Sequence, residues 1–284
     1  MENNTIKSKR ELPRIIINDD NGIKRLINLQ ELWQYRDLFW FLVKRDIKTR
    51  YAQSIMGVGW AIIQPVFSMI IFTIVFGNIA KINSEGIPYA IFSYTALVPW
   101  TYFSSSLTDS SRSLISSKNL ITKVYFPRLV IPIAPVLAKL IDFGISFLIL
   151  IGMMVWFDIM PSIWAAFIPI LVLIMMLAAA GVGMWLTALS IQYRDIQYGS
   201  SFFIQLLMYL SPVIYPASNV PDKFQLVYAM NPMVGVIEGF RAVLLGTHSM
   251  PWFYIGIGSA SAVVLFISGA LYFRRMERYF ADVA

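Results

Sequence analysis

The sequence contains no cysteine and only one histidine, His248, among its 284 residues. These absences exclude disulfides, thiolate metal sites and sites that need paired histidines. The phosphate-binding pattern G-x-x-x-x-G-K-[ST] is also absent, so the chain has no loop of that type to hold ATP. We therefore expect no catalytic residue, no metal site and no cofactor bound by this chain itself.

Charge is scarce as well. Charged residues make up 14% of the chain and hydrophobic residues 57%, with a mean hydropathy of +0.64, whereas soluble domains carry about 25% charged residues. This composition indicates an integral membrane protein. The net charge of +7 does not favour nucleic acid, because most of the basic residues flank apolar runs.

Six apolar runs are long enough to approach the roughly 20 residues that a helix needs to cross a bilayer. They cover roughly residues 56–80, 87–107, 134–157, 163–190, 199–216 and 252–273. Lipid offers no hydrogen-bond partners, and runs this long exclude a barrel, so the spans must be helices. The predicted fold is an all-α integral membrane protein with six transmembrane helices.

The basic residues predict the orientation. If six spans cross the membrane, 19 Lys and Arg residues lie on the same side as the termini. Only Lys81, Lys223 and Arg241 lie on the opposite side. The positive-inside rule then places both termini in the cytoplasm.

Residues 1–28 form a polar cytoplasmic lead. Residues 29–50 read as an amphipathic helix, favoured as interfacial over an ordinary soluble helix because a span follows at once.

Two connections carry further signals. The predicted cytoplasmic connection 108–128 contains apolar residues that a plain loop would expose to water: Leu120, Ile121, Val124 and Tyr125. They indicate docking onto a partner as an alternative to a plain loop. The outer region 217–250 is too interrupted to span, and short re-entrant or interfacial helices fit it better. There, Glu238 and Arg241 are i,i+3 neighbours, and we expect them to neutralise each other rather than bind a ligand. Lys139 and Asp142 are expected to do the same in the third span.

Aromatic, hydroxyl and amide side chains occur inside two spans. Tyr94 lies in the second, and Phe202, Phe203, Gln205 and Tyr209 lie in the fifth. Aromatic faces beside such polar groups suit sugars, which present both C–H faces and hydroxyls. The alternative is the interfacial aromatic belt of any membrane protein, which is at least as good an account of Trp100, Tyr102 and Tyr215.

Four ordered stretches resemble the ABC-2-type permeases that export polysaccharides: "RDLFWFLVKRDIKTRYAQSIMGVGWAIIQP", "KNLITKVYFPRLVIPIAPVLAKLIDF", "LSIQYRDIQYGSSFFIQLLMYLSPVIYP" and "NPMVGVIEGFRAVLLG". The resemblance runs from about residue 29 to the end, so that residues 51–284 form the transmembrane domain. It implies a homodimer that works with two copies of a separate ATPase subunit, which binds ATP and Mg. The implied substrate is a lipid-linked polysaccharide such as O-antigen, capsule or teichoic acid, and the implied location is the bacterial cytoplasmic membrane.

The resemblance also implies roles for particular residues. The coupling segment, which would contact the ATPase, would contain Lys118, Asn119, Leu120, Ile121, Val124, Tyr125 and Arg128. The channel walls would offer Trp60, Gln64, Tyr94, Phe202, Phe203, Gln205 and Tyr209 to the glycan. The lipid diphosphate would lie near Lys44, Arg45, Lys48 and Arg50, which could instead anchor the first span or contact bulk anionic lipid. The outer gate, within residues 221–246, would include Asn231, Glu238 and Arg241.

Two other functions compete with polysaccharide export. One is a permease for a drug or a small lipid. The other, from a different class, is a polytopic glycosyl- or phosphotransferase, which would need acidic or histidine-rich loops at the membrane edge. The outer connections offer few carboxylates for that chemistry, such as Asp158, Asp222 and Glu238, so the transferase is the weaker alternative.

Overall fold

The computed structural model describes residues 33–52, 57, 59–121, 126–193, 195–246 and 248–283. The expected lead 1–28, the first residues of the expected helix 29–50, and Val124 and Tyr125 lie outside these ranges. The side chain of Asn119 also lies outside the description.

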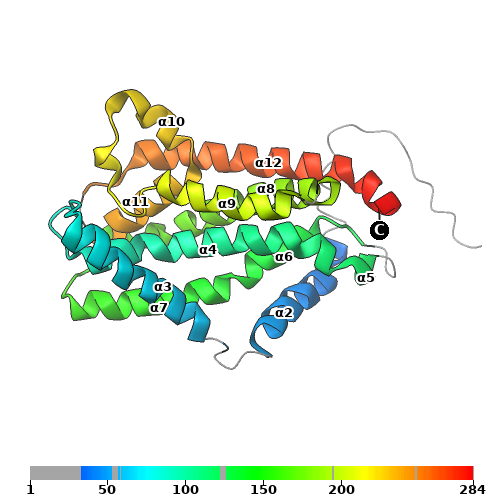
Figure 1. Cartoon of the computed structure of the whole chain (residues 1–284), viewed down its shortest axis with the longest axis horizontal. Coiled ribbons are helices and arrows are strands. Elements are labelled where there is room, and N and C mark those ends of the chain that lie inside the picture. Colours follow the sequence, from blue (N-terminus) through cyan, green and yellow to red (C-terminus); the bar gives the residue numbers. More distant parts are fainter. Residues whose placement is uncertain are drawn as a thin grey trace, which may run out of the picture.

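The described residues form helices joined by turns, with no strand among them. Figure 1 shows the long helices lying side by side as one bundle. The α-helices are α2 Arg36–Ala52, α3 Gly59–Phe72, α4 Tyr89–Ser116, α5 Lys118–Ile121, α6 Val130–Ala138, α7 Leu140–Trp156, α8 Ile168–Gln192, α9 Asp195–Tyr209, α10 Gln225–Ala229, α11 Pro232–Leu244 and α12 Trp252–Val283. A π-helix, η2 Thr73–Ile79, continues α3, and 3-10 helices occur at η3 Ile163–Phe167, η4 Ala217–Asn219 and η5 Asp222–Phe224.

Four helical stretches within the described ranges are long and apolar enough to cross a membrane: Gly59–Ile79, Val130–Trp156, Ile163–Gln192 and Trp252–Glu277. They correspond to the first, third, fourth and sixth expected spans. The third begins at Val130 instead of residue 134, and it consists of two helices that meet at Lys139. The expected second and fifth spans do not meet the same criterion.

Helix α4 carries the expected second span, but it is longer and more polar than expected. It continues to Ser116, so the connection expected at 108–128 begins only at Ser117. Its residues 91–100 are all buried. The hydroxyl of Thr95 donates to the carbonyl of Ile91 one turn earlier. A helix surrounded by other helices can keep hydroxyl side chains that a lipid-facing helix would avoid. This explains why α4 does not meet a criterion based on length and apolar composition.

Helix α9 covers only part of the expected fifth span. Its 15 residues end at Tyr209 rather than at 216. At about 1.5 Å per residue it is shorter than a hydrocarbon core of about 30 Å. Pro212 follows directly in the turns after the helix, where a proline removes an amide donor and prevents the helix from continuing. A single helix over 199–216 is therefore wrong.

The outer region contains short helices, as expected, and the largest of them is deeply placed. All 13 residues of α11 are buried. This helix packs against α4, α8 and α12. The arrangement fits a helix inserted into the end of the bundle better than one lying on its surface.

Helix α2 has a less regular apolar side than the sequence suggested. Leu42 and Val43 are buried in a core that also contains residues of α6, α8 and α12. By contrast, Trp33 and Trp40 are 69% and 54% exposed. The helix therefore packs on the bundle through one narrow stripe and leaves large aromatic side chains outside it.

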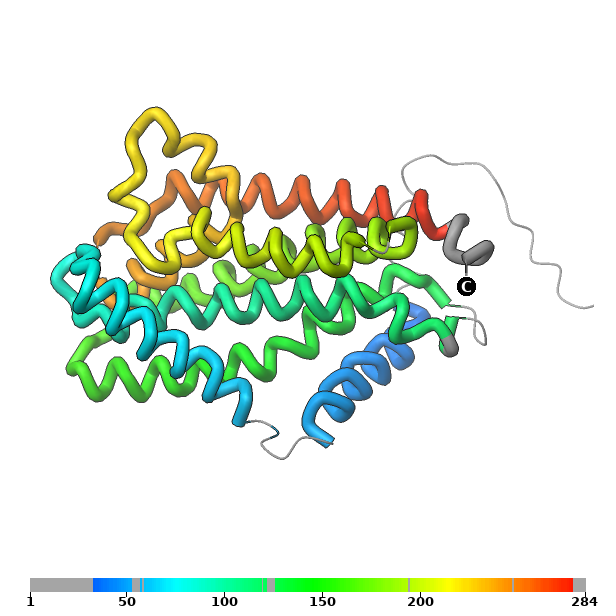
Figure 2. Tube along the Cα trace, in the orientation of Figure 1, coloured from blue at the N-terminus to red at the C-terminus, as the bar shows by residue number. Residues whose placement is uncertain are grey.

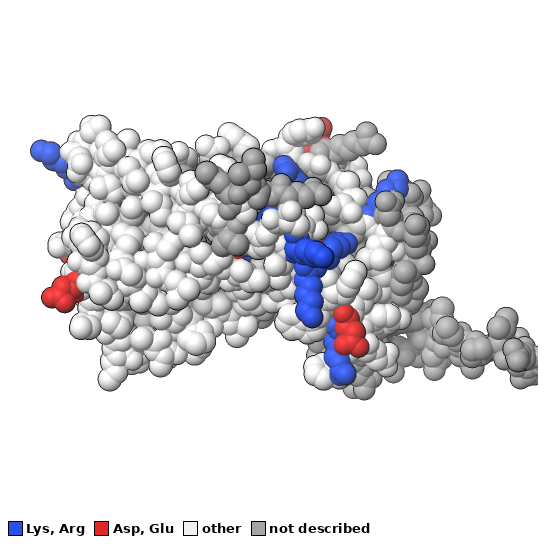
Figure 3. Space-filling view, turned by 90° about the horizontal axis from the view of Figure 1, so that it is seen from below, with Lys and Arg blue, Asp and Glu red and all other residues white. Residues whose placement is uncertain are grey.

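The two ends of the bundle differ in chemistry. Figure 2 shows the α3–α4 connection, α10 and α11 at one end, with α5 and the red C-terminal part of α12 at the other. In Figure 3 most of the visible surface carries no charge, and basic side chains gather over the part that contains α2. The long uncharged zone is what a bilayer core requires, and the basic zone suits a headgroup layer.

Candidate functional site

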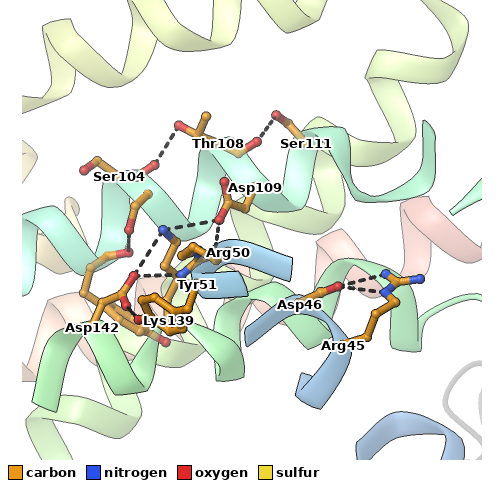
Figure 4. A network of polar contacts seen from close by, with 12 residues as sticks. Arg45, Asp46, Arg50, Tyr51, Ser104, Thr108, Asp109, Ser111, Lys139 and Asp142 are labelled. Carbon is orange, nitrogen blue, oxygen red and sulfur yellow. Dashed lines mark hydrogen bonds and ion pairs between the residues drawn. The ribbon is translucent and has the colours of Figure 1, made fainter. Parts of the chain in front are cut away.

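A cluster of four charged residues joins α2 to the bundle. Arg50, in the last turn of α2, donates to Asp109 of α4 at 2.5 Å and to Asp142 of α7 at 2.7 Å. Lys139, at the α6–α7 junction, lies 3.3 Å from the same two carboxylates. Two cations and two anions balance each other, so the cluster is neutral (Figure 4). It ties the end of α2 to three helices directly before the first span.

Tyr51 adds a neutral donor to this charge cluster. Its hydroxyl donates to the second carboxylate oxygen of Asp142. Partial burial and then the neighbouring Asp142 raise the pKa of Tyr51 to about 12. The hydroxyl therefore stays protonated at physiological pH and remains a hydrogen-bond donor. The expected Lys139–Asp142 pair is confirmed, but it is only one side of a larger network.

A cavity of about 130 Å³ opens beside this cluster. Its lining includes Arg50, Tyr51, Lys139 and Asp142, together with Trp60 and Gln64 of α3. The sequence assigned Trp60 and Gln64 to a channel wall and Arg50 to a headgroup region. The structure brings these two predicted groups together around one cavity.

The remaining predicted channel residues separate into two groups. On α9, the side chains of Phe202, Phe203 and Tyr209 are 65%, 49% and 50% exposed, and Gln205 is exposed too. Tyr94 is fully buried, with its hydroxyl 3.4 Å from the carbonyl oxygen of Ser146. Tyr94 therefore packs inside the bundle in this conformation, and its assignment to a glycan-contacting surface stays a prediction.

The predicted diphosphate residues are likewise not equivalent. Arg45 donates to Asp46 at 2.9 Å and to Ser117 at 3.2 Å, and Arg50 is held in the charge cluster. Lys44 and Lys48 are exposed on α2, and neither has an ion pair with another residue that the structure describes. Two of the four basic residues are thus used to hold α2 in place.

The predicted coupling segment is described in part. Lys118 is exposed, whereas Leu120 and Ile121 are half-buried against the core beneath α2. Arg128, at the other end of the segment, donates to the backbone carbonyl of Glu277 in α12 at 3.0 Å. The apolar side of α5 therefore packs partly on the chain itself, and the segment is fastened to the last helix.

At the opposite end of the bundle, Glu238 and Arg241 form the expected ion pair, which is confirmed at 2.9 Å. Both are buried, and Arg241 has no exposed side-chain surface. The guanidinium also donates to the carbonyls of Val213 and Tyr215 and stacks on the ring of Phe92, 3.7 Å from its centroid. The pair therefore anchors the turns that follow α9.

Asn231 and His248 complete this outer end. Asn231 caps α11 by accepting from the amide of Met233 and donates to Ser211. His248 lies 3.4 Å from both Glu85 and Glu238. Within the part of the chain that the structure describes, no three His, Cys, Asp or Glu residues could hold a metal ion together.

Sequence reasoning missed Asp109 as a partner of Arg50 and Tyr51 as a donor to Asp142. A signal for Asp109 was present, since it is the only acidic residue between Glu85 and Asp142. It was read as part of a loop because the polar run after residue 107 hid the continuation of α4. No sequence signal pointed to Tyr51.

These features define a polytopic membrane protein with apolar helices, charge clusters at both ends and a cavity beside one of them. The chain belongs to the ABC-2 type transporter family, whose model matches residues 37–245. It is thus a transport protein of the membrane, in agreement with the resemblance found in the sequence.

Curated relatives match over most of their length. The O-antigen export system permease protein RfbA of Myxococcus xanthus is 28% identical over 255 residues, 88% of this chain and 97% of that protein. The protein of the same name from Klebsiella pneumoniae is also 28% identical, over 92% of this chain and 99% of its own length. The polysialic acid transport protein KpsM of Escherichia coli is 26% identical, over 83% of this chain and 92% of that protein.

Proposed function

We propose that this chain is the membrane-spanning permease subunit of an exporter that moves a cell-surface polysaccharide across the bacterial cytoplasmic membrane. The near full-length match to relatives named for O-antigen export and polysialic acid transport carries this proposal. The exposed aromatic and amide side chains of α9 are compatible with it, because sugars stack on aromatic faces and hydrogen-bond to amides.

The energy for export would come from a separate ATPase subunit that binds ATP and Mg. The absence of a Walker-type phosphate loop from the sequence supports a hydrolysing site on another chain. We propose a homodimer of this chain with two copies of that subunit. The substrate would be lipid-linked, with the diphosphate nearest the exposed Lys44 and Lys48 of α2 rather than the paired Arg45 and Arg50.

The proposed orientation has six crossings and both termini in the cytoplasm. The basic bias of the sequence supports it, with α2, α5 and the end of α12 on the cytoplasmic side. In this arrangement α4 would cross in the centre of the bundle. Helix α9 and the turns after it would cross as a helix followed by a re-entrant segment anchored by Arg241.

Export can be tested in cells that make the polysaccharide and contain the partner ATPase. Removing this chain should leave lipid-linked polysaccharide inside the cytoplasmic membrane and take it from the surface, as measured by antibody labelling of intact and of permeabilised cells. A control with an inactive ATPase should give the same phenotype. Normal surface labelling without this chain, accompanied by altered tolerance of a small amphiphile, would favour the drug or lipid permease instead.

The ATPase contact can be tested by crosslinking, because the chain has no native cysteine. Lys118 is exposed at the start of α5, so Lys118→Cys should form a disulfide with a cysteine introduced on the ATPase surface. Ser218→Cys is the matched control, since residue 218 is exposed at the opposite end of the bundle. If Lys118→Cys crosslinks no better than Ser218→Cys across a panel of ATPase positions, α5 is not the docking element.

A further inference from the structure

An open polar groove lies between α2 and α4 and shares Arg50 with the cavity beside Trp60. Its volume is about 480 Å³. Helix α2 contributes basic, acidic and hydroxyl side chains to it, α4 contributes the same kinds, and Pro135 of α6 completes the lining. The lining residues are Arg45, Asp46, Thr49, Arg50, Asp109, Arg112, Ser113, Ser116 and Pro135.

Arg112 is the distinctive residue of this groove. The other two arginines are engaged by carboxylates, Arg45 by Asp46 and Arg50 by Asp109. Arg112 is exposed, and its guanidinium has no hydrogen bond or ion pair with any residue in the described ranges. Three arginines against two aspartates leave the lining with a net charge of +1. The groove therefore offers one uncompensated cation.

The groove is also at the level where a membrane changes from hydrocarbon to headgroup. The polar last turns of α4 line it, whereas its third wall is the apolar start of the Val130–Trp156 stretch. Phe41, which is 59% exposed, lies one turn before Arg45 on the same side of α2. Exposed aromatic side chains beside basic ones are typical of helices at the membrane interface.

From these observations we propose that the groove binds the phosphodiester headgroup of an anionic glycerophospholipid, with Arg112 as the cation that it neutralises. A phosphodiester brings one negative charge, which matches the net charge of the lining. The hydroxyl of Thr49 and the guanidinium of Arg112 supply donors from the two walls. The bound lipid would join α2 to α4 in addition to the Arg50 cluster. The proposal does not depend on which cargo the protein exports.

A diphosphate-linked lipid shares part of this chemistry, but two or more negative charges would exceed what the lining leaves uncompensated. Such a ligand would have to displace Asp46 or Asp109 from its arginine. The comparison between the two lipid classes is therefore part of the test.

The test measures lipid binding to the purified full-length protein in neutral detergent. Phosphatidylglycerol and phosphatidylcholine are titrated and followed by native mass spectrometry or by the shift in melting temperature. Arg112→Gln should weaken phosphatidylglycerol binding about tenfold, as expected when a charge-assisted hydrogen bond is lost. Arg112→Lys keeps the charge and should bind within about threefold of the unaltered protein. Arg36→Gln removes the same charge from an exposed α2 position outside the groove and should change little.

Several outcomes would overturn the proposal. Equal binding by Arg112→Gln and the unaltered protein would show that Arg112 holds no lipid, and an equal loss in Arg36→Gln would show a diffuse surface effect. Displacement of phosphatidylglycerol by inorganic phosphate at similar concentration would point to a free-anion site. Stronger binding of farnesyl diphosphate than of phosphatidylglycerol, weakened by Arg112→Gln, would assign the groove to a diphosphate lipid. The melting temperature of Arg112→Gln without lipid checks its fold, which the exposure of Arg112 should leave intact.

Discussion

Glu238→Ala is expected to destabilise the protein by about 3–5 kcal/mol, because it leaves a fully buried guanidinium without its counter-charge. Arg241 would keep only the carbonyls of Val213 and Tyr215 and the ring of Phe92. The amide of Ala217, which donates a hydrogen bond to the carboxylate of Glu238 at 3.1 Å, would lose its partner as well. The turns after α9 would therefore loosen together with α11, and the yield of folded protein in detergent should fall sharply.

The matched control for this variant is Asp158→Asn. It removes one negative charge from an exposed position, and asparagine tolerates the positive φ of 54° at that residue. It should shift stability by less than about 0.5 kcal/mol. Replacing both residues of the pair, as Glu238→Leu with Arg241→Met, should recover only part of the lost stability. The carbonyls that accept hydrogen bonds from Arg241 would remain unpaired. If Glu238→Ala has the same melting temperature as Asp158→Asn, the result would contradict the anchoring role of the Glu238–Arg241 pair.

The parts of the fold that were predicted correctly rest on local patterns. Long apolar runs identified the four stretches that meet the criterion for crossing a membrane. The i,i+3 spacing of Glu238 and Arg241 predicted their ion pair, since helical neighbours at that spacing meet whatever surrounds them. The ordered signatures predicted the family that the comparison confirmed.

Burial by other helices explains how α4 differs from the predicted second span. Helix α4 is enclosed, so its serines and threonines bond to carbonyls within the bundle instead of ending the span. Burial also makes Tyr94 a packing residue in this conformation. Composition along one segment cannot reveal which of its faces another segment covers.

The charged residues show the same limit. Arg50, Asp109 and Asp142 meet across sequence separations of 59 and 92 residues. The sequence displayed the basic cluster of α2 as one group, and only the fold divides it into paired arginines and exposed lysines. The proposed diphosphate position favours Lys44 and Lys48 for that reason, and the role of all four basic residues stays a prediction.

Gly269→Ala is expected to destabilise the α8–α12 contact by about 3 kcal/mol, the upper end of typical overpacking costs. A Cβ at residue 269 would lie 2.4 Å from the backbone oxygen of Gly181. No side-chain rotation can relieve a clash with backbone, so the two helices would have to move apart. The stacked rings of Trp185 and Tyr272, with centroids 4.2 Å apart, would then also be disturbed.

Gly256→Ala provides the control on the same helix. Nothing lies within 4 Å of a Cβ at that position, so alanine should be neutral or stabilising by up to about 1 kcal/mol through its higher helix propensity. Of the two glycine-to-alanine substitutions on α12, only Gly269→Ala should therefore lower stability, measured as melting temperature in detergent or as resistance to SDS-induced unfolding. If both variants shift stability the same way, the close approach of α8 and α12 at Gly181 and Gly269 does not hold in the folded protein. If only Gly269→Ala is destabilised, direct backbone packing holds this helix pair together, as small residues allow between membrane helices.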